Sequence, residues 1–320
     1  MTPQPRRVLL DHDGGVDDLL SLAMVLAMPH LQLAGVVVTP ADCYLGPAVS
    51  ATRKLLRWFG RDDVPIATGR LHGVNAFPPE WRAAPYIVDA LPLLNDDDRA
   101  LPPVGDERGD AFIARVLRDS PEPVTVLVTG PPSNLAAALA AEPALAAKVE
   151  EVVWMGGALR VRGNVCRHEH DGSAEWNAYW DPPAVASLWA QPVPITIVPL
   201  DATNEVPVSM AFLQRLARER AHPLADFAGQ CWATTVGTIP AYEYVYFMWD
   251  TLTTGYLGAP ALFRFEAVET VVDVAPPSAG RIRIAPGGRR VRAAVHADSG
   301  RFHDWLLGLL RCDPRDRHAV

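Results

Sequence analysis

The order of hydrophobic and polar positions in the first 70 residues predicts strands that alternate with helices. Arg7–Leu10 is a short apolar run that ends at Asp11, and the apolar spacing over Val16–Met28 is typical of a helix. Leu31–Thr39 is rich in β-branched residues, as expected for a second strand. The next two predicted elements are a helix over Pro47–Phe59 and a strand over Val64–Thr68. Strands that alternate with helices at this spacing indicate a parallel sheet with helices on both faces.

The alternation continues through the middle of the chain and then changes. The predicted helices cover Asp110–Arg118, Asn134–Glu142 and Pro183–Trp189, and the predicted strands cover Val124–Val128, Glu151–Met155 and Ile195–Pro199. Residues 207–258 have mainly helical patterns, residues 263–297 are typical of a small β-ribbon, and a last helix covers about Arg301–Arg311. We therefore expect one α/β domain over residues 1–320, with a mostly parallel, Rossmann-like central sheet, helices on both faces and a small C-terminal β-ribbon.

Composition narrows the class of protein further. Hydrophobic residues make up 49 % of the 320 residues and charged residues 21 %, which argues against disordered and fibrous proteins. The net charge of −8 argues against nucleic acid and anionic membranes as partners. No uncharged apolar run reaches the roughly 18 residues of a membrane span, and the N-terminus has no signal-peptide core, so we expect a cytoplasmic protein. The four cysteines lie far apart without a CxxC pair, which argues against a zinc site.

Four aspartates crowd the turn between the first strand and the first helix, at Asp11, Asp13, Asp17 and Asp18. Two carboxylates about 5 Å apart repel by roughly 3 kcal/mol at an effective dielectric of 20, so a bound cation would relieve the crowding. Oxygen ligands without a nearby Cys or His pair favour Ca²⁺ or Mg²⁺ over zinc. Capping of the helix explains one or two of the aspartates. EF-hand spacing does not fit, because Val16 and Leu22 stand where the loop glycine and the glutamate belong.

Two aspartates after a buried strand also resemble the haloacid-dehalogenase phosphatases, in which the first Asp attacks phosphate. That chemistry needs a downstream Lys followed by paired acids at the end of a later strand. The chain has only two lysines, Lys54 and Lys148, and the acids that follow Lys148 begin a strand instead of ending one. A phosphatase of this type therefore stays an alternative.

The segment Asp11–Asp18 resembles the N-terminal DxDxxxDD signature of the nucleoside hydrolases, which cleave the N-glycosidic bond of ribonucleosides with a bound Ca²⁺. Further segments match in the order of that family: Val128–Asn134, Met155–Ala158, Arg162–Val165, Ala174–Asn177, Asp181–Pro182 and Trp249–Asp250. Each motif is weak alone, but together they are specific. The resemblance extends to about residue 260 and implies the nucleoside hydrolase fold.

The resemblance implies a Ca²⁺ ion held by Asp13, Asp18, Asp250 and the backbone carbonyl of Thr129. Asp13 would also be the general base toward the water bound to that ion. The ribose hydroxyls would be bound by Asp17, Asn164, Glu175, Asn177 and Asp250. A site of buried polar groups rejects a ligand that lacks a hydroxyl, so deoxyribonucleosides are expected to be poor substrates.

Several positions are more similar to the purine-specific, inosine-adenosine-guanosine-preferring branch of the family. Asp42 stands where the broader family tends to have Asn. Trp249 stands where the inosine-uridine branch has the His that protonates the leaving base. The resemblance implies that Trp249 and Trp81 stack on the purine, with Trp249 favouring its protonated form. The expected function is Ca²⁺-dependent hydrolysis of purine ribonucleosides to ribose and free base, in purine salvage.

Some assignments stay open at this point. Because the leaving-group His is absent, a nucleoside-binding or Ca²⁺-binding protein without turnover is an alternative. Asp42 contacts either the base or Asp13, and no role is assigned to residues 165–173 or to the aromatic run Tyr242–Phe247. Gly15 stands where the purine-specific branch often has a side-chain amide. The resemblance further implies a homodimer or homotetramer.

Overall fold

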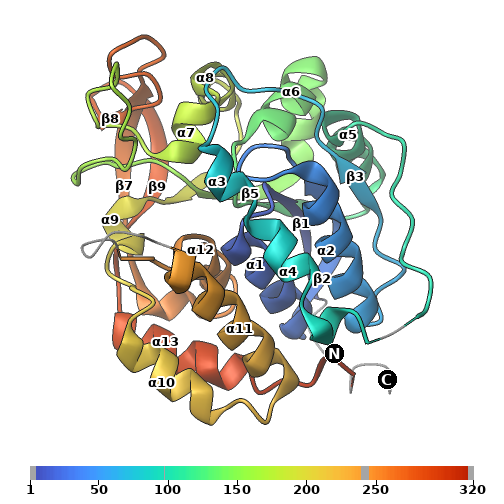
Figure 1. The fold of residues 1–320 in the computed structure, drawn as a ribbon. Helices are drawn as coiled ribbons and strands as arrows, with labels where there is room; N and C mark the ends of the chain where they lie inside the picture. The colour runs from blue at the N-terminus through green and yellow to red at the C-terminus, as the bar shows by residue number, and fades with distance from the viewer. Residues whose placement is uncertain (1–4, 97, 239–244, 316–320) are drawn as a thin grey trace.

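The structure is a computed structural model that describes residues 5–96, 98–238 and 245–315 (Figure 1). Its strands form one nine-stranded sheet in the order β3-β2-β1-β4-β5-β6-β9-β7-β8. The strands are β1 (Arg6–His12), β2 (Leu31–Val38), β3 (Ile66–Thr68), β4 (Val124–Val128), β5 (Val149–Met155), β6 (Ile195–Val198), β7 (Phe263–Val272), β8 (Ile282–Ile284) and β9 (Arg289–Ala297). Every pair from β3 across to β9 is parallel, which confirms the predicted sheet.

Helices cover both faces of this sheet, as predicted (Figure 1). The longer ones are α1 (Val16–Ala27), α2 (Leu45–Trp58), α5 (Gly109–Asp119), α6 (Ser133–Ala141), α8 (Pro182–Trp189), α10 (Met210–Arg218), α11 (Pro223–Thr238), α12 (Trp249–Tyr256) and α13 (Ser299–Leu309). The shorter ones are α3 (Pro79–Arg82), α4 (Ala84–Asp89), α7 (Trp176–Trp180), α9 (Leu200–Thr203) and the 3-10 turns η1 (Pro92–Leu94), η2 (Pro143–Lys148) and η3 (Pro260–Leu262). Within the described residues, no helix has the length and apolarity of a membrane span.

Alternating side chains of the central strands build two hydrophobic cores, one on each face. In β1, Val8 and Leu10 belong to the core under α1, α2 and α12, whereas Leu9 belongs to the core under α5, α6 and α8. This period of two is the geometry of a strand buried on both sides, and it explains why the strands read as continuous apolar runs in the sequence. The rigid sheet fixes the positions of the strand ends, where the polar residues lie.

Two details of the fold differ from the sequence-based expectation. The C-terminal β-ribbon is present, but β9 pairs in parallel with β6, so the ribbon continues the central sheet; β7 and β8 then add antiparallel strands at its edge. The short helices α3, α4 and α7 were not expected, because 4 to 6 residues are too few for a helical period to stand out.

Candidate active site

The acidic turn after β1 is shaped by a glycine. Gly14 has a φ of +81°, and a Cβ at this position would lie 2.6 Å from the Cβ of Ala48. Only glycine meets both demands without strain. The chain then turns directly into α1 at Val16, so Asp17 and Asp18 lie in the first helical turn, beside the positive end of the helix dipole.

Three carboxylates from two helices converge at this point. Oxygens of Asp17, Asp18 and Asp250 lie within 4.8 Å of one another, and all three side chains are buried. Asp250 lies in the first turn of α12, and its backbone N–H donates to Oδ2 of Asp17 at 3.4 Å. Asp17, which the resemblance assigns to ribose, thus also lies among the candidate cation ligands. The N-termini of α1 and α12 both add positive potential to the cluster.

Asp13 and Thr129 complete the acidic cluster. The backbone N–H of Asp13 donates to Oδ1 of Asp18 at 3.4 Å, and Oδ2 of Asp13 accepts the backbone N–H of Asp42 at 3.2 Å. Thr129, just after β4, donates its hydroxyl to Oδ1 of Asp18 at 2.5 Å. Asp18 also accepts the backbone N–H of Gly15 at 2.8 Å, as a helix cap does. Capping therefore accounts for one bond of Asp18 and leaves the convergence of the other carboxylates unexplained.

Asp11 has a different function from the other aspartates of the turn. Its Oδ1 accepts the hydroxyl of Thr39 at 2.7 Å, and its carboxylate accepts the amide of Asn134 at 3.3 Å. Burial raises the pKa of Asp11 to about 7 despite these hydrogen bonds. Asp11 therefore joins the ends of β1 and β2 to the start of α6 beneath the site. Asn134 lies in a matched motif, but the sequence assigned it no role.

The electrostatics of the cluster favour a bound cation. Burial, and then repulsion from neighbouring carboxylates, raises the pKa of Asp13 and of Asp250 well above its usual range. Burial and the charge of Asp17 raise the pKa of Asp18 to about 6. Oδ1 of Asp250 and Oδ1 of Asp42 are buried without a hydrogen-bond partner among the described residues. Unpaired oxygens in a crowded acidic site are what a hard cation such as Ca²⁺ or Mg²⁺ would ligate.

Asn177 lies beside the ends of β4 and β5, and Asn164 lies beside the start of α7. The side-chain amide of Asn177 donates to the carbonyls of Thr129 and Met155 at 2.9 and 3.1 Å, which uses both of its N–H groups and leaves its oxygen as the acceptor for a ligand hydroxyl. Oδ1 of Asn164 accepts the backbone N–H of Trp176 at 3.1 Å. Its amide N–H groups are then the donors that a hydroxyl could use.

Glu175 is built into the start of α7. Its carboxylate accepts the backbone N–H groups of Asn177, Ala178 and Gly157 at 2.8, 3.2 and 3.1 Å. Burial raises the pKa of Glu175 to about 7, against the effect of these hydrogen bonds. The sequence did not predict this capping function, because α7 itself was not expected.

The two tryptophans expected on the base side lie in different surroundings. Trp249 begins α12, next to Asp250, with its ring 4.8 Å from that of Tyr246, and its buried Nε1 has no hydrogen-bond partner among the described residues. Trp81 is 38 % exposed on α3 and packs edge-on against Trp176 at 5.5 Å. Both rings therefore have apolar surface near the site, and their stacking on a base stays a prediction.

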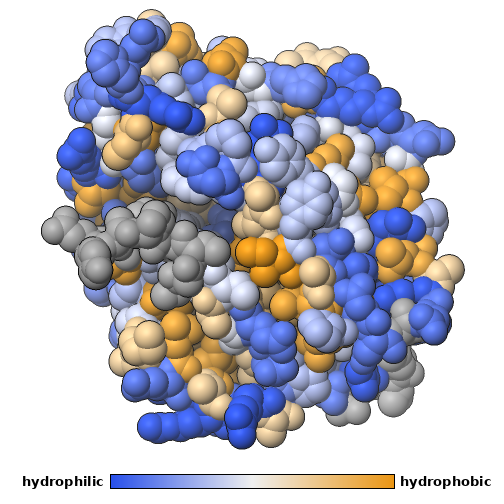
Figure 2. Space-filling view, in the orientation of Figure 1, coloured by the Kyte–Doolittle hydropathy of each residue, from blue (hydrophilic) through white to orange (hydrophobic). Residues whose placement is uncertain are grey.

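The surface and the aromatic run add two observations. Figure 2 shows hydrophobic residues grouped in the middle of the face presented by Figure 1, near α4 and α12. Tyr242 and Tyr244 of the aromatic run lie outside the described residues. Tyr246, within them, forms a hydrogen bond with Asp17 that opposes the rise in the pKa of that carboxyl caused by burial. Tyr246 therefore contacts the acidic cluster.

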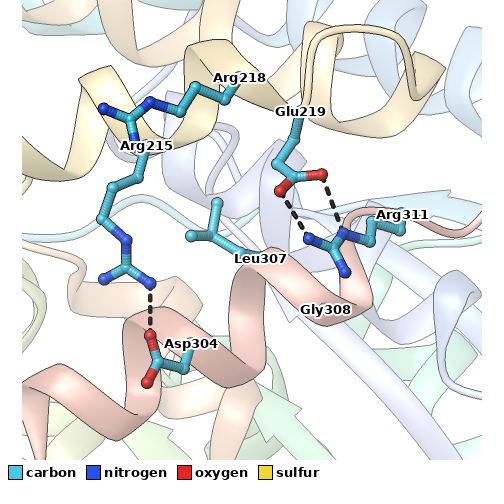
Figure 3. Close-up of a pocket in the computed structure, with 7 residues that line it drawn as sticks. All are labelled: Arg215, Arg218, Glu219, Asp304, Leu307, Gly308 and Arg311. Atoms are coloured by element: carbon cyan, nitrogen blue, oxygen red, sulfur yellow. Dashed lines mark hydrogen bonds and ion pairs between the residues drawn. The ribbon is translucent and has the colours of Figure 1, made fainter.

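A separate hollow of about 290 Å³ lies between α10 and α13 (Figure 3). Two ion pairs cross it, Arg215 with Asp304 and Arg311 with Glu219. Exposed ion pairs of this kind contribute little to stability, and none of the lining residues belongs to the acidic cluster. The strand ends, not this hollow, are therefore the candidate active site.

The buried carboxylates and amides lie at the carboxyl edge of a mostly parallel sheet, which is where ligands bind in open α/β enzymes. The family model described as inosine-uridine preferring nucleoside hydrolase matches residues 8–304, and the chain belongs to this family. It is therefore a hydrolase of N-glycosyl bonds.

Individual relatives differ in the base that they are named for. The chain is 28 % identical over 240 residues to a pyrimidine-specific ribonucleoside hydrolase RihA from Klebsiella pneumoniae (strain 342). The alignment covers 70 % of the chain and 69 % of that relative. The crystal structure of an inosine-uridine preferring nucleoside hydrolase from Bacillus anthracis is 38 % identical, with a TM-score of 0.91 and coverage of 96 % and 99 %. A purine-preferring ribonucleoside hydrolase from Gardnerella vaginalis, 23 % identical with a TM-score of 0.74 and the same coverage, shares the fold.

Proposed function

We propose that the chain hydrolyses purine ribonucleosides to ribose and free base with a bound Ca²⁺ ion. The observation that carries the purine preference is Trp249, an indole placed directly before the cluster carboxylate Asp250 at the start of α12. A flat aromatic surface at this position suits a two-ring base, and stacking contributes roughly 1–3 kcal/mol per base.

The cation would be held by Asp13, Asp18, Asp250 and the carbonyl of Thr129, with Asp17 beside them. All of these ligands are oxygens, and Ca²⁺ takes six to eight of them, so ligand hydroxyls and water have places in the shell. When bound, the ion lowers the pKa of coordinated water and polarises ribose hydroxyls. The unpaired Oδ1 of Asp250 supports this arrangement.

Asp13 is the general base in this proposal. It is buried at the cluster edge, and the backbone N–H of Asp42 fixes the direction of its carboxylate. Burial and neighbouring charges raise its pKa, which makes its ionised form a stronger acceptor for the proton of the attacking water. Asp42 thus supports Asp13 through its backbone and keeps a buried carboxylate oxygen free for the base.

Ribose is bound by hydrogen bonds of complementary type. The oxygen of Asn177 and the carboxylates of Asp17, Glu175 and Asp250 accept hydroxyl protons, whereas the amide of Asn164 donates. A deoxyribose would leave one of these buried groups without a partner.

The purine leaves more easily when it gains a proton. The electron-rich face of Trp249 favours a cationic ring, so stacking raises the basicity of the base and stabilises its protonated form as the glycosidic bond breaks. Trp81, exposed on α3, would cover the other face of the base. We further propose, from the family resemblance, a cytoplasmic homodimer or homotetramer that serves purine salvage.

Replacing Trp249 with Ala is expected to lower kcat/KM for inosine about tenfold to a hundredfold more than for nitrophenyl riboside, whose leaving group needs no proton. Replacing Trp81 with Ala should act in the same direction but less, because the ring is partly exposed. Tyr86, an exposed aromatic residue of α4, provides the control variant Tyr86→Ala. Equal losses on both substrates in Trp249→Ala would contradict the role of Trp249 in leaving-group departure.

A further inference from the structure

The two ends of one loop carry ribose-site residues. The backbone N–H groups of Asn164 and Val165 both donate to the carbonyl of Ala174, at 3.0 and 3.2 Å, so that residues 164–174 close into a compact loop. Asn164 stands at its start, and Glu175 and α7 follow its end. Because Oδ1 of Asn164 also accepts the backbone N–H of Trp176, Asn164 and the start of α7 move together with this loop.

The tip of the loop is fixed by His170, whose side chain is 3 % exposed. Its Nε2 lies 2.9 Å from the carbonyl oxygen of Ala279 in the turn between β7 and β8, and its Nδ1 accepts the backbone N–H of Gly172 at 3.0 Å. Because Nδ1 accepts, the ring proton of a neutral imidazole must be on Nε2, where it donates to Ala279. The ring also packs edge-on against Tyr179 of α7, 4.9 Å away. One side chain thus joins the loop, the β7–β8 turn and α7.

Neighbouring residues support the same contact. The backbone N–H of Asp171 donates to the carbonyl of Pro277 at 3.0 Å, and the hydroxyl of Ser278 donates to the carboxylate of Asp171. Gly280 has a φ of +86°, and a Cβ there would lie 2.6 Å from Cα of Tyr179, so the turn packs directly on the backbone of α7. Figure 1 shows α7 beside the β7 and β8 end of the sheet.

The C-terminal end of α7 is held separately. The amide of Asn75 donates to the carbonyl of Tyr179 at 2.6 Å, and its backbone N–H donates to the carbonyl of Trp180 at 3.1 Å. These bonds do not involve His170. Loss of the His170 contacts would therefore shift α7 and its preceding loop without releasing them from the protein.

We propose that His170 is a positioning residue of the ribose site, which holds loop 164–174 and α7 against the β7–β8 turn so that Asn164 and Asn177 meet the ribose hydroxyls together. The inference rests on the proposed function in one respect, the assignment of these amides to ribose. His170 itself has both ring nitrogens engaged and is buried, so it acts through the loop and not on the substrate.

The test compares His170→Ala, His170→Gln and the matched control His168→Ala on a ribonucleoside and its 2′-deoxy counterpart. In His170→Ala, kcat/KM for the ribonucleoside should fall, and its ratio to that for the deoxyribonucleoside should fall about tenfold, because hydroxyl contacts are lost. Gln can donate to Ala279 and should restore most of the ratio. His168 is exposed in the same loop, so His168→Ala should leave the ratio of the two kcat/KM values unchanged.

A purely structural role predicts a different result, in which His170→Ala lowers both values equally or changes neither; either outcome would overturn the proposal. Ser278→Ala removes one hydroxyl that donates to Asp171 and serves as a milder second variant, with a smaller fall in the ratio expected. The two substrates are inosine and 2′-deoxyinosine. If the enzyme prefers uridine, uridine and 2′-deoxyuridine are used instead. Failure of the purine preference is therefore distinguishable from failure of this inference.

Discussion

Replacing Asp13 with Ala is expected to lower kcat for inosine by at least about a thousandfold, while the folded variant still binds inosine. The side chain is buried at the acidic cluster and oriented by the backbone N–H of Asp42, so its loss removes the acceptor placed for the proton of the attacking water. The measurement is ribose release at saturating Ca²⁺, with inosine binding followed by calorimetry.

Asp18→Ala distinguishes the two functions proposed for Asp13, which are cation binding and general-base catalysis. Asp18 belongs to the cluster of converging oxygens but is not the base, so excess Ca²⁺ should restore part of its activity and should not restore that of Asp13→Ala. Asp110 on α5 pairs with Arg108, and Asp110→Ala provides the control, for which normal turnover is expected. Normal turnover in Asp13→Ala would rule out its role as general base.

Calcium is expected to raise the melting temperature by roughly 4 °C at about a hundredfold excess over Kd, and more strongly at pH 8 than at pH 5. The direction of the pH dependence follows from the pKa values of the buried carboxyl groups. Folding raises the pKa of Asp18 to about 6 and that of Asp11 to about 7, above the unfolded value of 3.8. Their contribution to stability is complete below pH 4 and is lost as the pH rises through 6 to 7. The ion-free protein should therefore melt lower at pH 8.

Asp250→Ala provides the matched test of this effect. The variant should lose most of the shift caused by Ca²⁺, because it lacks the carboxylate whose Oδ1 has no protein partner. Without Ca²⁺ at pH 8 it should melt higher than the unchanged protein, because one repelling charge is gone. Asp273→Ala, on the β7 side of the sheet, should keep the full shift. A melting temperature of the unchanged protein that does not rise with Ca²⁺ at either pH would contradict the proposed cation site.

The fold could be predicted largely from the sequence because its central strands are buried on both faces. The runs at β1, β2 and β4 are mostly apolar and end at polar residues, which indicates both the parallel sheet and the edge where ligands are expected to bind. The pairing of β9 with β6 could not be predicted, since it joins segments about 95 residues apart by backbone bonds alone.

The site could be predicted only in part. The crowding of Asp13, Asp17 and Asp18 is visible in one segment, but Asp250 lies more than 200 residues later and was placed by resemblance. The backbone hydrogen bonds of Glu175 and the loop contacts of His170 depend on α7 and the β7–β8 turn, neither of which has a periodic pattern. Residues that act through hydrogen bonds to the backbone of distant segments can therefore be identified only from the structure.

The most direct test of the account measures base release from inosine, guanosine, adenosine and uridine, and phosphate release from a phosphate monoester, each with chelator and then with added Ca²⁺. The account predicts hydrolysis of the purine ribonucleosides with kcat/KM at least about tenfold above uridine, loss of this activity with chelator, recovery with Ca²⁺, and an intact phosphate monoester. Uridine hydrolysed as fast as inosine, activity that persists with chelator, or binding of nucleosides without release of base would contradict it.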